Sequence, residues 1–137
     1  MKILILNGPN LNLIGQREPE IYGKLTFDEA LKLWSEEFSL EIDFFQSNVE
    51  GELINTLQNS DADGIIFNAG AYTHTSIGLR DAVSAISIPV MEVHLSNITK
   101  RESFRHESFL TPVCVGCIFG LGMESYRLAL TYFQNKN

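Results

Sequence analysis

The chain has 137 residues, a length that suits one domain with a core of its own. Hydrophobic residues make up 45% of it, charged residues 20%, and the formal net charge is -7. An acidic chain without a basic run argues against nucleic-acid or anionic-membrane binding, and no apolar stretch approaches the ~20 residues of a membrane span. Because the first residues show no signal-peptide pattern, we expect a cytoplasmic protein with neither nucleic acid nor membrane as partner.

Apolar runs typical of buried strands alternate along the chain with amphipathic stretches typical of helices. Five runs are expected to be strands: 2–6, 41–46, 64–68, 89–95 and 113–119. Four stretches are expected to be helices: one opened by a capping box of Thr26 and Glu29, one capped by Ser47 or Asn48, one capped by Ser76, and one over 123–134. A short polar helical piece is also expected near 97–104.

This alternation of strands and helices is typical of βαβ units, which build a parallel sheet covered on both faces. We therefore expect one domain over 1–137 with an α/β fold. The expected architecture is a flavodoxin-like, doubly wound, five-stranded parallel sheet in three α/β/α layers. In such sheets ligands bind beyond the carboxyl ends of the strands.

Polar residues gather where three of the expected strands end. The first strand leads to Asn10, and the third ends in Asn68 with His74 beyond it. The fourth strand carries Glu92 and His94. Because the two asparagine-bearing loops hold almost no acidic residues, a phospho-accepting domain that binds Mg²⁺ is disfavoured. Amides suit hydrogen bonds to a polyhydroxylated small molecule instead.

Glu92 and His94 are two residues apart on a strand, so their side chains are expected on the same face of the sheet. A carboxylate beside an imidazole fixes its tautomer and raises its basicity, which suits a general acid or base. The alternative is a structural pair at a sheet edge. His74 taken alone is equally consistent with a hydrogen-bonding group at the start of a helix.

Arg101 and Arg105 are spaced i, i+4 in an otherwise acidic chain. In a helical turn they would share a face and form an anion clamp. The alternative is a solvated charged face in which Glu102 and Glu107 balance the two arginines.

The segment between Gly15 and Gly23 carries Arg17 and Tyr22 and has the composition of a hinged lid. An unperturbed tyrosine has a pKa of about 10, so forming tyrosinate at neutral pH requires about 4 kcal/mol. A nearby arginine favours the anion. Arg17 and Tyr22 are therefore either a supported base or incidental residues of an exposed loop.

Cys114 and Cys117 form a C-x-x-C pair. A redox role would need a helix N-terminus directly after the first cysteine, whereas the flanking residues are apolar and typical of a buried strand. We therefore interpret both as ordinary buried thiols. The three histidines and this pair have no spacing typical of a zinc site.

Five stretches together closely resemble the type II 3-dehydroquinases (3-dehydroquinate dehydratases): NGPNLNLIGQREPEIYG, FFQSNVEGELI, NAGAYTHTSIGLRDA, MEVHLSN and RESFRHESFL. The resemblance runs from Lys2 to about Ala129 in the order and spacing of that family. It implies a flavodoxin-like fold, a homododecamer built as a tetramer of trimers, and a hydro-lyase without cofactor or metal. The implied reaction is the reversible dehydration of 3-dehydroquinate to 3-dehydroshikimate, by anti elimination through an enolate. That reaction serves aromatic amino acid biosynthesis by the shikimate route or the breakdown of quinate.

The resemblance also implies catalytic roles for individual residues. Tyr22 matches the tyrosinate that takes the C2 proton, and Arg17 matches the arginine that keeps it ionised. Asn10 matches an asparagine that holds a water near the developing enolate oxygen. His94 matches the acid that protonates the leaving hydroxyl, and Glu92 matches the carboxylate that orients this histidine.

Further positions match substrate-binding residues of the family. Hydroxyl groups of the substrate are matched by Asn68, His74 and Arg105, and its carboxylate by the backbone N–H groups of Leu95 and Ser96. Arg101 matches a second lid arginine, and Asp81 matches a residue that reaches the active site of a trimer neighbour. The chain departs from the family at a few positions that match no catalytic residue. Ser125 stands where glycine is frequent, Phe67 where smaller aliphatics are usual, and both cysteines where small apolar residues are common.

Two alternative functions make different predictions. A flavodoxin-like module for FMN or another phosphate-bearing ligand needs a Ser/Thr/Gly-rich phosphate loop after the first strand, and the sequence has none there. A non-catalytic protein that keeps the fold should have lost residues of the matched site. Arg17, Tyr22, His94 and Arg105 are nevertheless all present.

Overall fold

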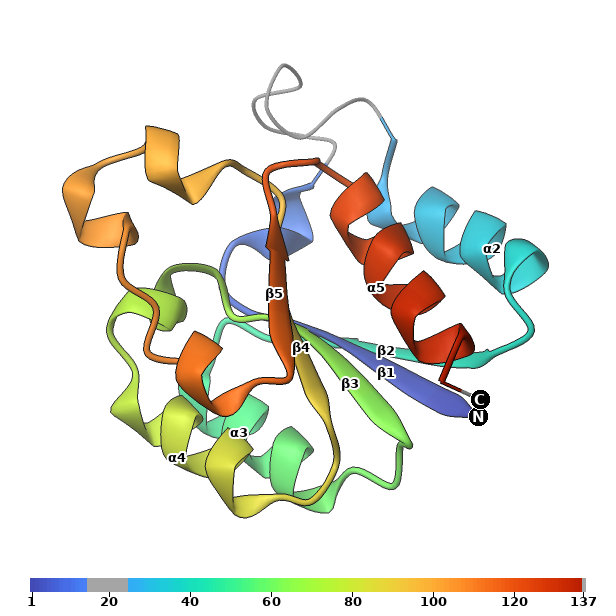
Figure 1. Ribbon diagram of the computed structural model, residues 1–137, viewed down its shortest axis with the longest axis horizontal. Helices are drawn as coiled ribbons and strands as arrows, with labels where there is room; N and C mark the ends of the chain where they lie inside the picture. Colours follow the sequence, from blue (N-terminus) through green and yellow to red (C-terminus); the bar gives the residue numbers. More distant parts are fainter. Residues whose placement is uncertain (15–24, 137) are drawn as a thin grey trace.

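A parallel sheet lies at the centre of the computed structural model, which describes residues 1–14 and 25–136 (Figure 1). Its strands are β1 (Lys2–Asn7), β2 (Glu41–Gln46), β3 (Gly64–Asn68), β4 (Val90–His94) and β5 (Gly116–Phe119). They form a 5-stranded sheet in the order β2-β1-β3-β4-β5, and each neighbouring pair is parallel. This is the doubly wound, flavodoxin-like order expected from the sequence, with the switch in strand order at β1 and β3.

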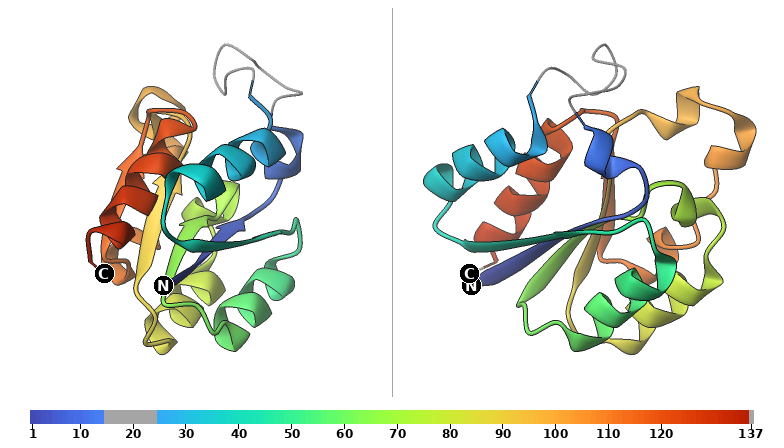
Figure 2. Two further views of the ribbon diagram at one scale, coloured as in Figure 1. Left: turned by 90° about the vertical axis from the view of Figure 1, so that its right-hand side faces the viewer. Right: turned by 180° about the vertical axis from the view of Figure 1, so that it is seen from behind.

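Helices cover both faces of the sheet, which gives the three expected layers (Figure 2). The four α-helices of the described residues are α2 (Phe27–Glu37), α3 (Glu50–Asn59), α4 (Ile77–Ala85) and α5 (Glu124–Gln134). On one face, Ile3 and Ile5 of β1 pack in a cluster with α2 and α5, and on the other, Leu4 and Leu6 pack with α3 and α4. Successive residues of a strand point to opposite faces, so the continuous apolar run of β1 serves both layers. In the part of the chain that the structure describes, no helix is long and apolar enough to cross a membrane.

Two of the helix starts are as the sequence predicted. The Glu29 N–H donates to Thr26 Oγ1 (3.2 Å) and the Thr26 N–H donates to Glu29 Oε2 (3.0 Å), which completes the capping box. Ser76 Oγ accepts from the Leu79 N–H (2.9 Å) at the start of α4. The predicted cap of α3 was wrong, because its N-cap residue is Val49. Ser47 lies two residues earlier and accepts from the Val49 N–H (2.9 Å), which shapes the turn before the helix.

The segment between β4 and β5 differs most from the prediction. In place of one helical piece near 97–104 there are two 3-10 helices, Ile98–Lys100 and Ser103–Arg105, and a third follows at Thr111–Val113. The last of these includes a proline at its start, which has no N–H to contribute to a strand ladder. The fifth strand therefore begins at Gly116 and not at residue 113.

The carboxyl ends of β1 and β3 approach each other closely at Gly8. Its N–H donates to the Asn68 carbonyl oxygen (2.7 Å), and a Cβ at this position would lie 2.6 Å from the Ala69 carbonyl oxygen. We expect Gly8→Ala to lower the free energy of unfolding by about 1–3 kcal/mol, because backbone atoms must move to relieve the overlap. Gly51→Ala is the matched control, since a Cβ there would meet nothing within 4 Å.

The two variants can be compared by urea denaturation. In α3 the Gly51→Ala change should leave stability equal or raise it by roughly 0.5–1 kcal/mol, because alanine favours a helix. If Gly8→Ala proved as stable as Gly51→Ala, the close approach of the two strand ends would be contradicted.

Candidate active site

A cleft of about 210 Å³ opens at the carboxyl ends of the strands around the switch in strand order. Most of the expected site residues that the structure describes line it: Asn10, Asn68, His74, His94, Leu95, Ser96, Arg101 and Arg105. Glu92 lies buried behind His94. Asp81 is exposed on α4 and is not among the lining residues. Arg17 and Tyr22, the expected lid residues, lie outside the described part of the chain.

Asn68 is held at the cleft by contacts to both groups of its amide. Its Oδ1 accepts from the Gly70 N–H (3.1 Å) and its Nδ2 donates to the Tyr126 hydroxyl (2.8 Å). That hydroxyl in turn donates to Asn7 Oδ1 (2.8 Å). Burial raises the pKa of Tyr126 well above its usual value, so the hydroxyl keeps the proton that it donates. Sequence reasoning missed Tyr126 and Asn7, although a tyrosine on the apolar face of a helix signals a buried hydroxyl that needs a partner.

Replacing Tyr126 with phenylalanine should destabilise the fold. The change leaves Asn7 Oδ1 and Asn68 Nδ2 buried without this partner, and each unsatisfied group costs about 1–3 kcal/mol. We expect a loss of at least that size in the free energy of unfolding, measured by urea denaturation. Tyr132→Phe on the same helix is the control, because its hydroxyl makes no hydrogen bond within the described residues. Equal stability of the two variants would argue against the buried chain of hydrogen bonds.

Asn10 lies on the rim, directly after β1. Its φ of 69° places it in the left-handed region, which asparagine tolerates better than most residues. Its N–H donates to Asn48 Oδ1 (3.0 Å), and the Asn48 carbonyl oxygen accepts from the Tyr72 hydroxyl (2.8 Å). Residues after β1, β2 and β3 thus fix the turn that places Asn10 beside the cleft.

Glu92 and His94 lie on the same face of β4, as their spacing predicted, and His94 Nε2 is 2.6 Å from Glu92 Oε2. Glu92 is fully buried, and its Oε1 accepts from the hydroxyls of Ser108 (2.9 Å) and Thr111 (2.7 Å). Burial would raise the pKa of Glu92, but the hydrogen bonds from His94, Thr111 and Ser108 outweigh it, so the pKa lies below its usual value. A buried carboxylate held ionised in this way fixes the ring tautomer of His94. Sequence reasoning missed Ser108 and Thr111.

His74 faces the same cleft. Its Nδ1 donates to the Glu107 carbonyl oxygen (2.7 Å), which leaves Nε2 as the acceptor nitrogen of a neutral ring. Burial lowers the pKa of His74, and the nearby His94 and Arg105 lower it further, whereas the bond to Glu107 opposes them. The rings of His74 and His94 are stacked, with centroids 6.3 Å apart. The two imidazoles therefore present different hydrogen-bonding groups side by side.

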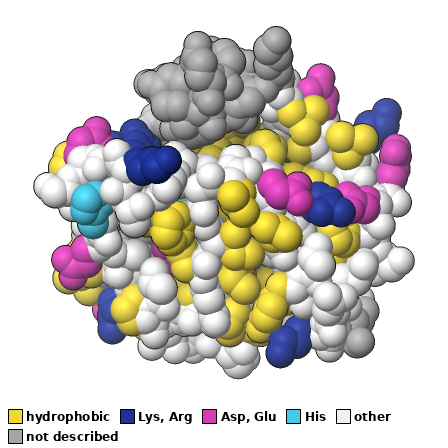
Figure 3. Space-filling model, turned by 45° about the horizontal axis from the view of Figure 1, so that its top comes forward, with side chains coloured by type: hydrophobic (Ala, Val, Ile, Leu, Met, Phe, Trp, Pro, Cys, Tyr) yellow, Lys and Arg dark blue, Asp and Glu magenta, His cyan; other side chains and the backbone are white. Residues whose placement is uncertain are grey.

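Arg101 and Arg105 both line the cleft, although they do not share a helical turn. Figure 3 shows neighbouring Lys and Arg side chains at the upper left of the face that it presents. Arg105 Nε donates to Glu102 Oε2 (2.7 Å), and an Arg101 guanidinium N–H donates to Ser96 Oγ (3.4 Å). Arg101 follows the 3-10 helix Ile98–Lys100 and Arg105 ends the next one, Ser103–Arg105, so the single helical turn that would give the pair a shared face does not form. Arg101 and Arg105 line the same cleft because of the path that the chain takes between β4 and β5.

The two cysteines are half-buried, and Cys117 Sγ lies 3.3 Å from Glu92 Oε2. Burial raises the pKa of Cys114 to about 12, and burial together with Glu92 raises the pKa of Cys117 further. Thiols with raised pKa values react slowly, which agrees with the interpretation as buried thiols and not as a redox pair.

Comparison with known proteins decides the family. A family model described as "Dehydroquinase class II" matches residues 1–134. This chain belongs to the class II dehydroquinases. It is 56% identical over 137 residues to the 3-dehydroquinate dehydratase of an Exiguobacterium species, which covers 95% of this chain and 92% of that protein. It is 55% identical over 135 residues to the 3-dehydroquinate dehydratase of Prochlorococcus marinus, with 95% and 93% covered.

Solved structures agree with the family match. The type II dehydroquinase from Butyrivibrio crossotus superimposes with a TM-score of 0.91 at 43% identity, covering 96% of both chains. That from Propionibacterium acnes gives 0.91 at 37% identity, covering 98% of this chain and 96% of the other. The sequence-based predictions of the family, of the flavodoxin-like fold and of a hydro-lyase are confirmed. The family match therefore favours a dehydroquinase over the two alternative functions, the FMN-binding module and the non-catalytic protein.

Proposed function

We propose that this dehydroquinase dehydrates 3-dehydroquinate in the cleft described above, with one catalytic domain over 1–137. The observation that carries the proposal is the buried Glu92–His94 pair, which joins a cleft lined by amides, imidazoles and arginines. The substrate is a polyhydroxylated ring with a ketone and a carboxylate. Amides and imidazoles suit its hydroxyls, and arginines suit its negative charge.

His94 is the proposed general acid. Its Nε2 is engaged by Glu92, so Nδ1 is the ring nitrogen left to deliver a proton to the leaving hydroxyl. The ionised Glu92 stabilises the imidazolium that must exist before this transfer. Ser108 and Thr111 hold the carboxylate from behind, so they act as positioning residues and not as catalytic ones.

Tyr22 is the proposed base, with Arg17 keeping it ionised, as the resemblance of their segment to the family implies. The proton to be removed lies alpha to a ketone, so its loss gives an enolate and requires a strong base near neutral pH. Asn10 is the proposed holder of a water beside the enolate oxygen, and its fixed turn on the rim supports that role. Departure of the protonated hydroxyl on the opposite face completes an anti elimination.

The remaining residues are proposed to bind the substrate. Asn68, His74 and Arg105 would contact hydroxyls, and the backbone N–H groups of Leu95 and Ser96 would hold the carboxylate near Arg101. Each of these residues lines the cleft, and His74 offers as an acceptor its Nε2, which bonds to no described residue. We call Arg101 and Arg105, which both line the cleft, the arginine rim. Although the net charge of the chain is -7, this rim provides local positive charge that attracts an anion.

The proposed assembly is a cytoplasmic homododecamer, a tetramer of trimers. Asp81 supports it, because this residue is exposed on α4 and does not line the cleft of its own subunit. A residue that completes the active site of a neighbouring subunit would be exposed and would lie away from the cleft of its own subunit. Sedimentation of the purified protein would measure the assembly directly.

The function is tested by mixing purified protein with 3-dehydroquinate and following the ultraviolet absorbance of the conjugated enone product. A rise that persists in the presence of a chelator is expected, because no step above uses a metal. If a folded, assembled sample gave no rise, the cleft would serve another substrate and the proposal would fail.

A further inference from the structure

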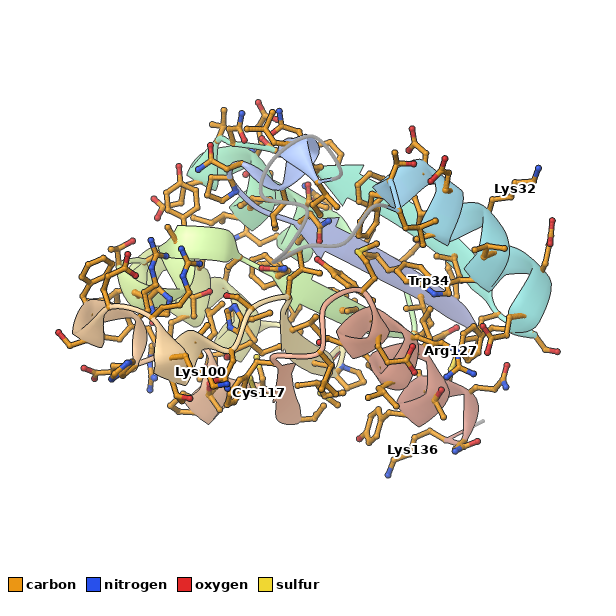
Figure 4. All side chains as sticks on the ribbon, turned by 90° about the horizontal axis from the view of Figure 1, so that it is seen from above. Lys32, Trp34, Lys100, Cys117, Arg127 and Lys136 are labelled. Carbon is orange, nitrogen blue, oxygen red and sulfur yellow. The ribbon has the colours of Figure 1, made fainter. Side chains whose placement is uncertain are left out.

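The parallel register of the last two strands brings a thiol to the buried acid pair. Glu92 of β4 is paired with Cys117 of β5, and His94 is paired with Phe119. Because paired residues of neighbouring strands project on the same face, the Cys117 side chain lies beside that of Glu92. Cys117 Sγ is 3.3 Å from Glu92 Oε2. Figure 4 shows Cys117 at β5, between the segment that carries Lys100 and the helix that carries Arg127.

Three groups with metal-binding chemistry therefore converge: a carboxylate oxygen of Glu92, a ring nitrogen of His94 and Cys117 Sγ all lie within 4.8 Å of one another. Glu92 Oε2 is the oxygen that contacts both His94 Nε2 and Cys117 Sγ. A tetrahedral zinc site with bonds of about 2.0–2.3 Å needs ligand atoms roughly 3–4 Å apart. The Glu92–His94 contact of 2.6 Å must open by about 1 Å to reach that spacing, whereas the Glu92–Cys117 contact of 3.3 Å already has it. Ser108 and Thr111 both bind Oε1, so Oε2 is the oxygen that remains for an ion.

Charge also favours a divalent ion at this place. One carboxylate, one thiolate and one neutral imidazole together carry two negative charges, which a divalent cation balances. A buried charge is tolerated only when it is compensated, and Glu92 is fully buried and His94 nearly so. A mixture of oxygen, nitrogen and sulfur ligands is typical of zinc and of ions that resemble it.

We propose that Glu92, His94 and Cys117 form an inhibitory site for a divalent ion of the zinc type. On binding, the Cys117 thiol releases its proton to solvent, and the proton of the neutral His94 ring moves from Nε2 to Nδ1. The ion takes the place of the hydrogen bond between Glu92 and His94. Sequence spacing did not predict the site because its ligands come from two strands that only the sheet register brings together.

Inhibition is the functional consequence, and this step rests on the function proposed above. A metal-bound imidazole cannot become the imidazolium that delivers a proton to the leaving hydroxyl. The ion also removes Glu92 from the ring that it orients. Binding of zinc should therefore abolish dehydration without blocking the arginine rim of the cleft.

The first experiment follows binding without activity, by adding cobalt(II) to the assembled enzyme under reducing, anaerobic conditions. A thiolate-to-cobalt charge-transfer band in the near ultraviolet is expected, with one ion per subunit at saturation and displacement by zinc. Cys117→Ala should lose the band, and the matched control Cys114→Ala should keep it. Absence of the band from the wild-type enzyme would overturn the proposal, whatever the variants do.

The second experiment measures dehydration with increasing zinc chloride, each variant being compared with its own rate in chelator. Zinc should inhibit the wild type and Cys114→Ala, and chelator should restore the rate. The zinc concentration for half inhibition should rise at least tenfold in Cys117→Ala. Equal inhibition of both variants would contradict the site. An enzyme with the cobalt band but without dehydratase activity would instead overturn the proposed function and leave the metal site intact.

Discussion

His94→Ala is expected to lower kcat by about 10²–10⁴-fold, the usual contribution of a positioned general acid. The reason is geometric: His94 lines the cleft, and its Nε2 is held at 2.6 Å by the buried carboxylate of Glu92. No other described residue of the cleft has that partner. Because the proposed acid would act on the leaving group and not on the bound ground state, KM should change by only a few-fold.

Steady-state kinetics with 3-dehydroquinate measure both constants, and circular dichroism checks that the variant is folded. His106→Ala is the control, since this histidine is exposed and its Nε2 contacts only the Arg101 carbonyl oxygen (3.0 Å) within the described residues. Its kcat should stay within a few-fold of the wild type. A His94→Ala enzyme with near-normal kcat would rule out this histidine as the acid.

Tyr22→Phe should have an effect at least as large, because it removes the proposed base and leaves the described residues of the cleft unchanged. We expect kcat to fall by about 10²–10⁴-fold or more, since a proton alpha to a ketone is not removed by a weaker group at neutral pH. Thermal unfolding should be unchanged. Tyr132→Phe, far along the chain on α5, serves as the control for the loss of a tyrosine hydroxyl.

The same assay measures this variant, with substrate raised well above KM so that the chemical step is isolated. Near-normal turnover of a folded Tyr22→Phe enzyme would sink the assignment of the base. Comparable losses in Tyr22→Phe and His94→Ala, beside normal rates in both controls, would agree with one reaction that uses two separate proton-transfer groups.

Local patterns were enough to place most of the fold. The capping box of Thr26 and Glu29 and the cap at Ser76 were predicted because each lies within one turn of the helix that it starts. The strands buried on both faces were visible as continuous apolar runs. The predicted cap at Ser47 or Asn48 was wrong, because α3 begins after Val49 and the Ser47 hydroxyl accepts from the Val49 N–H and donates to Glu52 Oε2.

The site was predictable only where its residues are close in sequence. Glu92 and His94 are two apart on a strand, so the alternation of side chains alone predicted that both lie on the same face of the sheet. Ser108, Thr111 and Cys117 reach Glu92 from 16 to 25 residues away, through the path between β4 and β5 and the pairing of those strands. No periodicity in the sequence reports contacts of that kind. The resemblance to a family supplied the remaining roles.

The central claim is that acid and base act separately on one substrate in this cleft. It is tested most directly by incubating 3-dehydroquinate in deuterium oxide with each variant and following its C2 hydrogens by nuclear magnetic resonance, against a sample without enzyme. With His94→Ala, deuterium should enter C2 of the unreacted substrate faster than without enzyme while little 3-dehydroshikimate forms, because the base still makes the enolate. With Tyr22→Phe, neither exchange nor dehydration should exceed the background. Exchange catalysed by Tyr22→Phe, or no exchange with His94→Ala, would contradict the claim.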